Sequence, residues 1–114
     1  MTWRPISLEK LNELISSELL DTETPTYRLW SIIKIHPEKW IEHEYGTEGG
    51  GFWVVGILGK HVVWFNDIEG GFNISPFSNY GTIDEYEVEQ FALHHVLTNI
   101  NLYLNEGKKG RYFW

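Results

Sequence analysis

Cysteine is absent from the 114 residues of this chain, and its absence removes several chemistries at once. Without cysteine the chain forms no disulfide framework, no thiolate metal site and no cysteine nucleophile. Such a composition fits a reducing compartment, and residues 1–10 lack the apolar core of a secretory signal. We therefore expect a cytoplasmic protein.

Long hydrophobic runs and cations are also scarce. The longest apolar stretch, residues 52–58, is far shorter than the ~20 residues that cross a bilayer, so no membrane association is expected. Lysine and arginine number nine against sixteen acids, which gives a net charge of -7. Nucleic-acid binders normally carry a basic patch, so we expect no nucleic-acid partner. The three cations within residues 108–111 are interpreted as a solvated chain end.

The sequence contains no nucleophile elbow, P-loop or dinucleotide fingerprint, and the Gly49-Gly50-Gly51 run lacks the residues that phosphate chemistry requires. His94 and His95 are adjacent, whereas a helical pair of metal ligands needs a spacing of three or four residues. We expect no metal, no cofactor and no enzymatic activity. On a helix His94 falls on the polar stripe, and His95 falls on an apolar flank as a core or interface residue.

The chain is long enough for one domain with its own core, spanning residues 1–114. Leucines and isoleucines recur at helical spacing over residues 8–20, and Ser7 is suited to cap that helix. Thr24-Pro25 is a second start signal, for a helix that must end before Pro37. A third, long helix is predicted over residues 88–105, because its apolar positions follow the helical period.

Strand signals lie between these helices. Residues 52–58 and 61–65 are β-branched and aromatic, and Gly59-Lys60 between them suits a type II′ turn, so a central hairpin over 52–65 is predicted. Further strands are expected at 72–75 and 82–86, and an edge strand at 40–45. The predicted fold is α+β, with an antiparallel sheet of about four strands packed by two N-terminal helices and one long C-terminal helix.

Two features suggest contacts with another molecule. Aromatic residues make up 16% of the chain and include six tryptophans, more than we expect the core to hold, so some should lie at the surface as contact residues. The predicted last helix is apolar on two flanks, which calls for a second packing partner such as another helix or a second subunit. A homodimer is therefore one expectation.

The most distinctive segment runs over residues 63–75, where an aromatic strand turns through acids and glycines into another strand. Two interpretations stay open. The polar side chains present acceptors to a partner beside an aromatic anchor, or they form an ordinary turn in which Asn and Asp bond their own backbone. Asp84 and Glu85 are candidates for a carboxylate pair or for the acidic start of the last helix. The candidate binding residues are Trp64, Asn66, Asp67, Glu69, Phe72, Asn73, Asp84 and Glu85.

The segments 64–69 and 71–75 resemble a stretch found in small uncharacterised bacterial proteins, and the small, acidic, aromatic-rich character is similar to bacterial immunity proteins that neutralise toxin domains. The resemblance implies a cytosolic inhibitor that binds a toxin, through an acidic surface if the toxin is a basic nuclease. The leading hypothesis is thus a non-enzymatic protein-binding module. The alternatives are a homo-oligomer with a separate role, or a small-molecule or carbohydrate module in which tryptophan stacks on the ligand.

Overall fold

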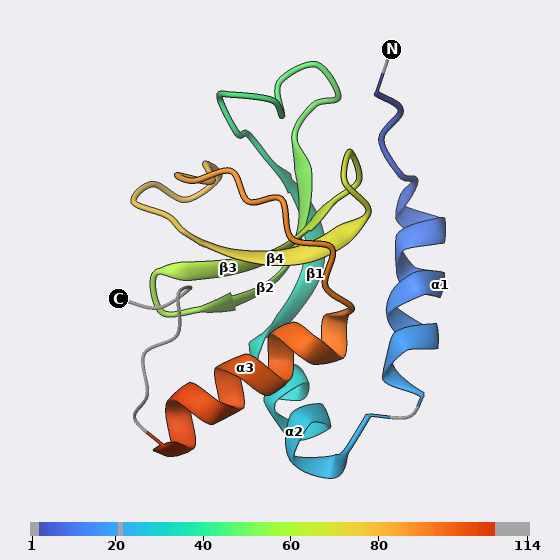
Figure 1. Cartoon of the computed structure of the whole chain (residues 1–114). Coiled ribbons are helices and arrows are strands. Elements are labelled where there is room, and N and C mark those ends of the chain that lie inside the picture. The colour runs from blue at the N-terminus through green and yellow to red at the C-terminus, as the bar shows by residue number, and fades with distance from the viewer. Residues whose placement is uncertain (1–2, 21, 107–114) are drawn as a thin grey trace.

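The computed structural model describes residues 3–20 and 22–106, and within them three helices accompany one four-stranded antiparallel sheet (Figure 1). The strands follow one another as a meander, in the spatial order β1-β2-β3-β4. This confirms the predicted α+β class and the four-stranded sheet. In chain order the elements are α1 (Leu8–Leu19), α2 (Thr24–Ile33), β1 (Lys34–Trp40), β2 (Phe52–Leu58), β3 (His61–Asn66), β4 (Gly71–Pro76) and α3 (Leu93–Glu106).

The first helix and the central hairpin form as their sequences predict. The Ser7 hydroxyl accepts a hydrogen bond of 3.2 Å from the Lys10 amide, which caps α1. In the turn between β2 and β3, Gly59 has a φ of +59°. Lys60 does not have a positive φ, and one positive φ at the first central residue is the pattern of a type II′ turn.

The second helix ends before Pro37 as predicted, and the strand that follows it corrects a prediction. Helix α2 begins at Thr24, with Glu23 as its N-cap and no side-chain cap, and it ends at Ile33. The next residues already form β1, so the predicted strand at 40–45 is wrong: Trp40 ends the strand, and a turn follows. Proline is tolerated at Pro37 because β1 is an edge strand whose pairing with β2 is irregular between Lys34 and Glu38.

Residues 82–92 also differ from the prediction. Thr82 makes only an isolated parallel bridge to Ile41, so the predicted strand over 82–86 does not form. Helix α3 begins at Leu93, five residues later than expected, because the preceding segment runs extended beside β4, where the Phe72 amide donates to the Phe91 carbonyl at 2.8 Å. Val88 and Phe91, two apolar positions of the predicted last helix, therefore lie outside α3, and the homodimer stays a prediction.

The sheet carries a hydrophobic core on each face. Alternate residues such as Val63 and Phe65 face the three helices, and the others, such as Val62 and Trp64, face the opposite side. No helix covers that second side among the described residues. It is covered instead by residues 41–51, which follow β1, and by residues 77–91, which follow β4 (Figure 1).

Candidate functional site

The core of the loop-covered face is built largely from aromatic rings. Phe52 and Trp64 lie side by side with ring centroids 4.7 Å apart, and Tyr86 packs against both at 6.0 Å. Trp3 reaches the same cluster, 5.0 Å from Phe52. The surplus aromatics therefore fill a second core. Every described tryptophan and phenylalanine is buried or half-buried, and the aromatic side chains that are exposed are the tyrosines Tyr27, Tyr45 and Tyr80.

A buried carboxylate shapes the first covering loop. Glu42 is only 3% exposed, and its side chain accepts hydrogen bonds from the amides of Glu44 (3.0 Å), Tyr45 (2.6 Å) and Gly46 (3.1 Å). Three such donors satisfy a charge that would otherwise be costly to bury. The carboxylate thereby fixes the turn from which Tyr45 projects.

The two covering loops present exposed tyrosines that rest on the buried rings. Tyr45 is 51% exposed and lies 4.4 Å from the Tyr86 ring, and Tyr80 is 67% exposed and lies 4.7 Å from the Trp40 ring. The loops are joined by backbone hydrogen bonds, from the Ile41 amide to the Gly81 carbonyl and from the Ile83 amide to the Ile41 carbonyl. Both tyrosines thus lie on adjoining loops.

Glu38 connects the second tyrosine to the sheet. Its carboxylate accepts hydrogen bonds from the Tyr80 hydroxyl and from Trp40 Nε1, the latter at 2.9 Å. These bonds favour the ionised carboxylate, so the pKa of Glu38 is lowered, and the same bond to Glu38 raises the pKa of Tyr80.

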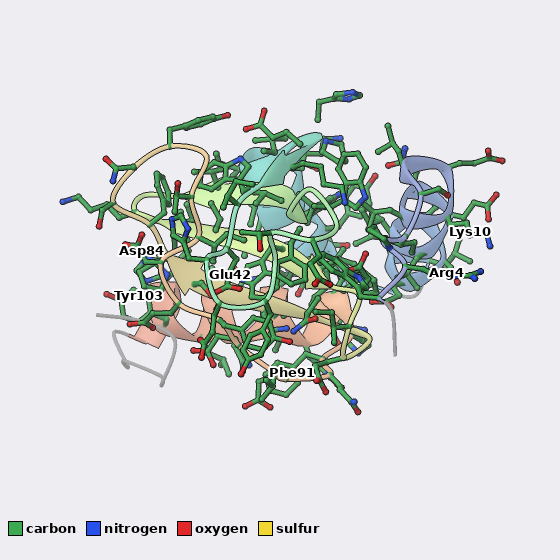
Figure 2. The ribbon with its side chains drawn as sticks, turned by 90° about the horizontal axis from the view of Figure 1, so that it is seen from above. Arg4, Lys10, Glu42, Asp84, Phe91 and Tyr103 are labelled. Atoms are coloured by element: carbon green, nitrogen blue, oxygen red, sulfur yellow. The ribbon has the colours of Figure 1, made fainter. Side chains whose placement is uncertain are left out.

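Exposed acids lie on the same two loops as these tyrosines. Figure 2 shows Glu42 centrally and Asp84 at one side, whereas Arg4 and Lys10 lie at the opposite side with α1. The sequence places Glu44 and Glu48 on the first covering loop and Asp84 and Glu85 on the second, all four exposed. We call this surface the loop face, defined by the exposed side chains of Tyr45, Tyr80, Glu44, Glu48, Asp84 and Glu85.

Four of the predicted binding residues lie in the interior. Trp64, Asn66, Phe72 and Asn73 are each 0% exposed, so none of these side chains is accessible to a partner in this structure. This corrects the interpretation of Trp64 and Phe72 as surface anchors. Trp64 donates from Nε1 to the Ser75 hydroxyl at 2.9 Å, and Phe72 packs against Phe65 at 4.9 Å.

The two asparagines hold the backbone of the second covering loop. Asn73 Nδ2 donates to the Glu89 carbonyl at 3.0 Å, and its Oδ1 accepts from the Glu89 amide at 3.0 Å. Asn66 donates to the Glu87 carbonyl at 2.8 Å, and the Ser75 hydroxyl donates to the Glu85 carbonyl at 2.8 Å. These side chains supply the hydrogen bonds that a neighbouring strand would supply along β4, which is a structural role.

The acids of the β3–β4 turn are also engaged within the chain. Asp67 accepts hydrogen bonds from Trp3 Nε1 at 2.9 Å and from the Ile6 amide at 2.6 Å, which fastens the N-terminal segment to the turn. Burial raises the pKa of Asp67, against the opposing effect of these bonds and of Lys39. The carbonyl of Glu69, which is half-buried, accepts from Gln90 Nε2 at 2.9 Å.

The structure separates the predicted acids into two groups. Asp67 and Glu69 precede β4, whereas the Asp84 amide donates to the Pro76 carbonyl at the far end of that strand, about 17–20 Å away along six residues. Asp84 accepts from the Ser78 hydroxyl at 2.7 Å, so with Glu85 it belongs to a loop and not to a helix start. Of the eight predicted site residues, the loop face includes Asp84 and Glu85.

The histidines follow the prediction in part. His94 is exposed as expected, but His95 is exposed as well, which corrects its assignment to the core and leaves the interface alternative a prediction. The two rings lie 4.3 Å apart on the first turn of α3. Among the residues that the structure describes, no group of three or more His, Asp or Glu side chains is placed to hold a metal ion.

Sequence reasoning missed Tyr45, Tyr80, Glu44 and Glu48 as a group, because their loops were assigned partly to strands. One signal was present: each tyrosine stands directly before a glycine, in a segment rich in turn-forming residues. Such segments favour exposed loops, where binding residues concentrate.

Over residues 3–20 and 22–106, no helix combines the length and the apolar character needed to cross a membrane. A scan against protein-family models, a search of curated proteins and a search of solved structures gave no match to the chain. The chain's own residues and their geometry therefore carry the inference about function.

Proposed function

We propose that the chain is a non-enzymatic protein-binding module that uses the loop face to bind a basic partner, in the manner of an immunity protein that inhibits a toxin domain. The observation that carries this proposal is the pair of exposed tyrosines, Tyr45 and Tyr80, seated on buried aromatic rings among exposed acids. A cytoplasmic location belongs to the same proposal.

Preorganisation supports this use of the tyrosines. Tyrosine is enriched in binding hot spots, and a ring already held by packing loses little conformational freedom on binding. Tyr45 is held by Tyr86 and by the turn that Glu42 closes, and Tyr80 by Trp40 and Glu38. An association through these side chains would need little rearrangement of the loops.

Charge supports the choice of a basic partner. The whole chain carries a net charge of -7, and four exposed acids lie on the same two loops as the tyrosines. A surface of one sign speeds encounter with a partner of the opposite sign and discriminates against partners of the same sign.

The structure gives less support to the two alternatives, a homo-oligomer and a carbohydrate-binding module. The most exposed apolar side chains, Leu20 and Ile32 at about the same exposure, sit near the ends of α1 and α2, and Leu104 sits near the end of α3. Figure 1 places the last turns of α1 and α3 on opposite sides of the helical layer, so Leu20 and Leu104 belong to separate patches. In the carbohydrate module expected from the sequence, tryptophan stacks on the ligand, and each described tryptophan is buried or half-buried.

The proposal is tested by affinity capture from the native host with three forms of the full chain. The loop-face variant carries Tyr45→Ala and Tyr80→Ala. The control carries Tyr27→Ala and Ile32→Ala on α2, where Tyr27 is 49% exposed and so matches Tyr45. Circular dichroism and thermal unfolding establish that all three forms are folded.

The wild type and the control should capture the same basic protein, and the loop-face variant should lose it. The association rate should fall as salt is raised, because salt screens the charges that steer the encounter. Capture that survives the loop-face substitutions, or a partner of acidic surface, would contradict the proposal.

A further inference from the structure

A groove that contains none of the loop-face residues opens where α2 passes into the edge strand β1. Its cavity volume is about 350 Å³, within the range that small-ligand sites occupy. Asn12 and Ile15 line it from α1, Trp30 from α2 and Val55 from β2, and residues 34–37 line it from β1.

The irregular pairing of β1 with β2 coincides with this groove. The register shifts between Lys34 and Glu38, so residues 35–37 of β1 stand opposite Val55 of β2 alone. Residues 35–37 and Val55 all line the groove. Bulges of this kind bend a strand and re-aim its side chains, and they are over-represented beside active sites. The bulge therefore shapes one wall of the groove.

The Trp30 indole gives an independent indication of a ligand. Each of the other four described tryptophans donates its indole N–H to an acceptor within the chain, and these are Trp3, Trp40, Trp53 and Trp64. Trp30 is only 6% exposed, yet its Nε1 has no hydrogen-bond partner among the described residues. Buried tryptophans usually pair this group. The atom is not fully enclosed by the core, so it is open to an acceptor in the groove that Trp30 lines.

The charge beside Trp30 is positive. The Lys34 ammonium forms no ion pair with a described residue, and no carboxylate is among the described lining residues of the groove. The C-terminus of α2 adds the equivalent of about half a negative charge, which the full charge of Lys34 exceeds. The Lys34 amide donates to the Trp30 carbonyl four positions earlier, so the two side chains are neighbours. A negatively charged acceptor suits this pair.

We infer that the groove between α1, α2 and β1 binds a small organic carboxylate with an apolar body, which accepts from the Trp30 indole N–H and pairs with the Lys34 ammonium. A carboxylate is an acceptor only, and hydrogen bonds to it are strengthened by its charge. The half-buried side chains of Ile35 and Pro37 contact the apolar body. The carboxylate belongs to a free metabolite or to the C-terminus of a peptide. The inference does not depend on the loop face.

The test follows the amide and indole N–H signals of the ¹⁵N-labelled full chain during titration with 3-phenylpropionate. Two controls separate the charge from the apolar body. The amide 3-phenylpropanamide keeps the ring and the shape without the charge, and acetate keeps the charge without the ring.

A saturating shift of the Trp30 indole signal, together with shifts at the Lys34 and His36 amides, supports the inference. The neutral amide should bind about two- to fivefold more weakly, as expected for loss of a partly solvated charge pair. A Trp30 indole signal that does not move would overturn the inference. Equal binding of the neutral amide, or of acetate, would also overturn it.

The source of the carboxylate is distinguished by a second titration. N-acetylphenylalanine contains the 3-phenylpropionate skeleton and adds the amide group of a peptide C-terminus. Tighter binding of N-acetylphenylalanine indicates a peptide C-terminus, and tighter binding of 3-phenylpropionate indicates a free metabolite.

Three variants connect the binding to the named residues. Lys34→Gln should weaken binding of 3-phenylpropionate about two- to fivefold and leave binding of the neutral amide unchanged. Trp30→Phe keeps an aromatic ring and should weaken binding about two- to tenfold through the lost hydrogen bond, read from the Lys34 and His36 amides. Lys10→Gln removes an exposed charge of α1 outside the groove and should leave the affinity unchanged.

Amide spectra of each variant show whether its fold is retained, and Lys34 is exposed, so Lys34→Gln keeps the test valid if Trp30→Phe does not fold. If Lys34→Gln binds 3-phenylpropionate like the wild type, the site is not this groove. If Lys10→Gln weakens binding as much as Lys34→Gln, the effect is one of net charge, and the inference fails.

Discussion

The two faces of the sheet are closed in different ways. On the helical face, aliphatic side chains such as Leu97 and Ile100 of α3 join Val63 and Phe65 of β3 in one hydrophobic cluster. On the loop-covered face, aromatic rings form the core, and buried polar side chains such as Asn73 tie irregular backbone to the strands. The helical face therefore depends on apolar contact area, and the other face depends on specific hydrogen bonds.

The largest expected effect concerns the helical face. Leu97 is fully buried, so Leu97→Ala should lower the free energy of unfolding by about 3 kcal/mol, through lost apolar contact and the cavity left behind. Urea denaturation measures the change. Leu102→Ala, at an exposed position of the same helix, should stay within about 0.5 kcal/mol of the wild type. Equal losses from both substitutions would show that α3 does not pack as described.

A smaller and more local effect is expected on the loop-covered face. Asn73→Ala should cost about 2 kcal/mol of unfolding free energy, because the partly buried amide and carbonyl of Glu89 lose their side-chain partner. Hydrogen exchange should become faster at the Glu89 amide before it changes at the α3 amides.

Asn79→Ala, at an exposed position in the same covering loop, should leave both the stability and the exchange rates unchanged. If Asn73→Ala accelerates exchange evenly over the whole chain, the contrast between a local and a global effect does not hold.

The smallest effect is a pH dependence at Asp67. Burial raises its pKa in the folded state, so the folded protein binds this proton more tightly than the unfolded chain does. The contribution of Asp67 to stability is then fully present below the unfolded pKa, and it is lost as pH rises through the folded pKa.

Asp67→Asn removes this titration. The unfolding free energy of the variant should therefore increase relative to that of the wild type as pH is raised from about 3 to 7, across the model-peptide pKa of Asp near 3.9. Urea denaturation of both proteins across this range measures the difference. A difference that is constant with pH, or that moves the other way, would show that the Asp67 carboxylate is not perturbed as inferred.

The same contrast explains which parts of the fold the sequence could predict. The α1 helix and the β2–β3 hairpin follow from local signals, the Ser7 cap and the Gly59-Lys60 turn. Strand β1 was missed because Pro37 argues against a strand unless the strand is known to lie at an edge. Edge position is a property of the assembled sheet.

The start of α3 was misjudged for a related reason. Val88, Phe91 and Ala92 continue the helical spacing, but Asn66 and Asn73 capture the backbone of residues 87 and 89 in extended form. Those asparagines are distant in sequence, so no local pattern reveals the contact. For the candidate site, the sequence identified the distinctive asparagines but not the backbone they bind, and it gave no indication that Tyr45 and Tyr80 lie on adjoining loops.

The edges of the sheet bear on how the protein behaves at high concentration. At one edge Pro37 has no amide hydrogen to offer a further strand, and the irregular pairing of β1 with β2 disturbs the flat row of backbone groups that a second molecule would need. At the other edge the segment beside β4 occupies the Phe72 amide. Both ends of the sheet are therefore protected against growth by addition of strands, and we expect concentrated protein to resist β-type aggregation.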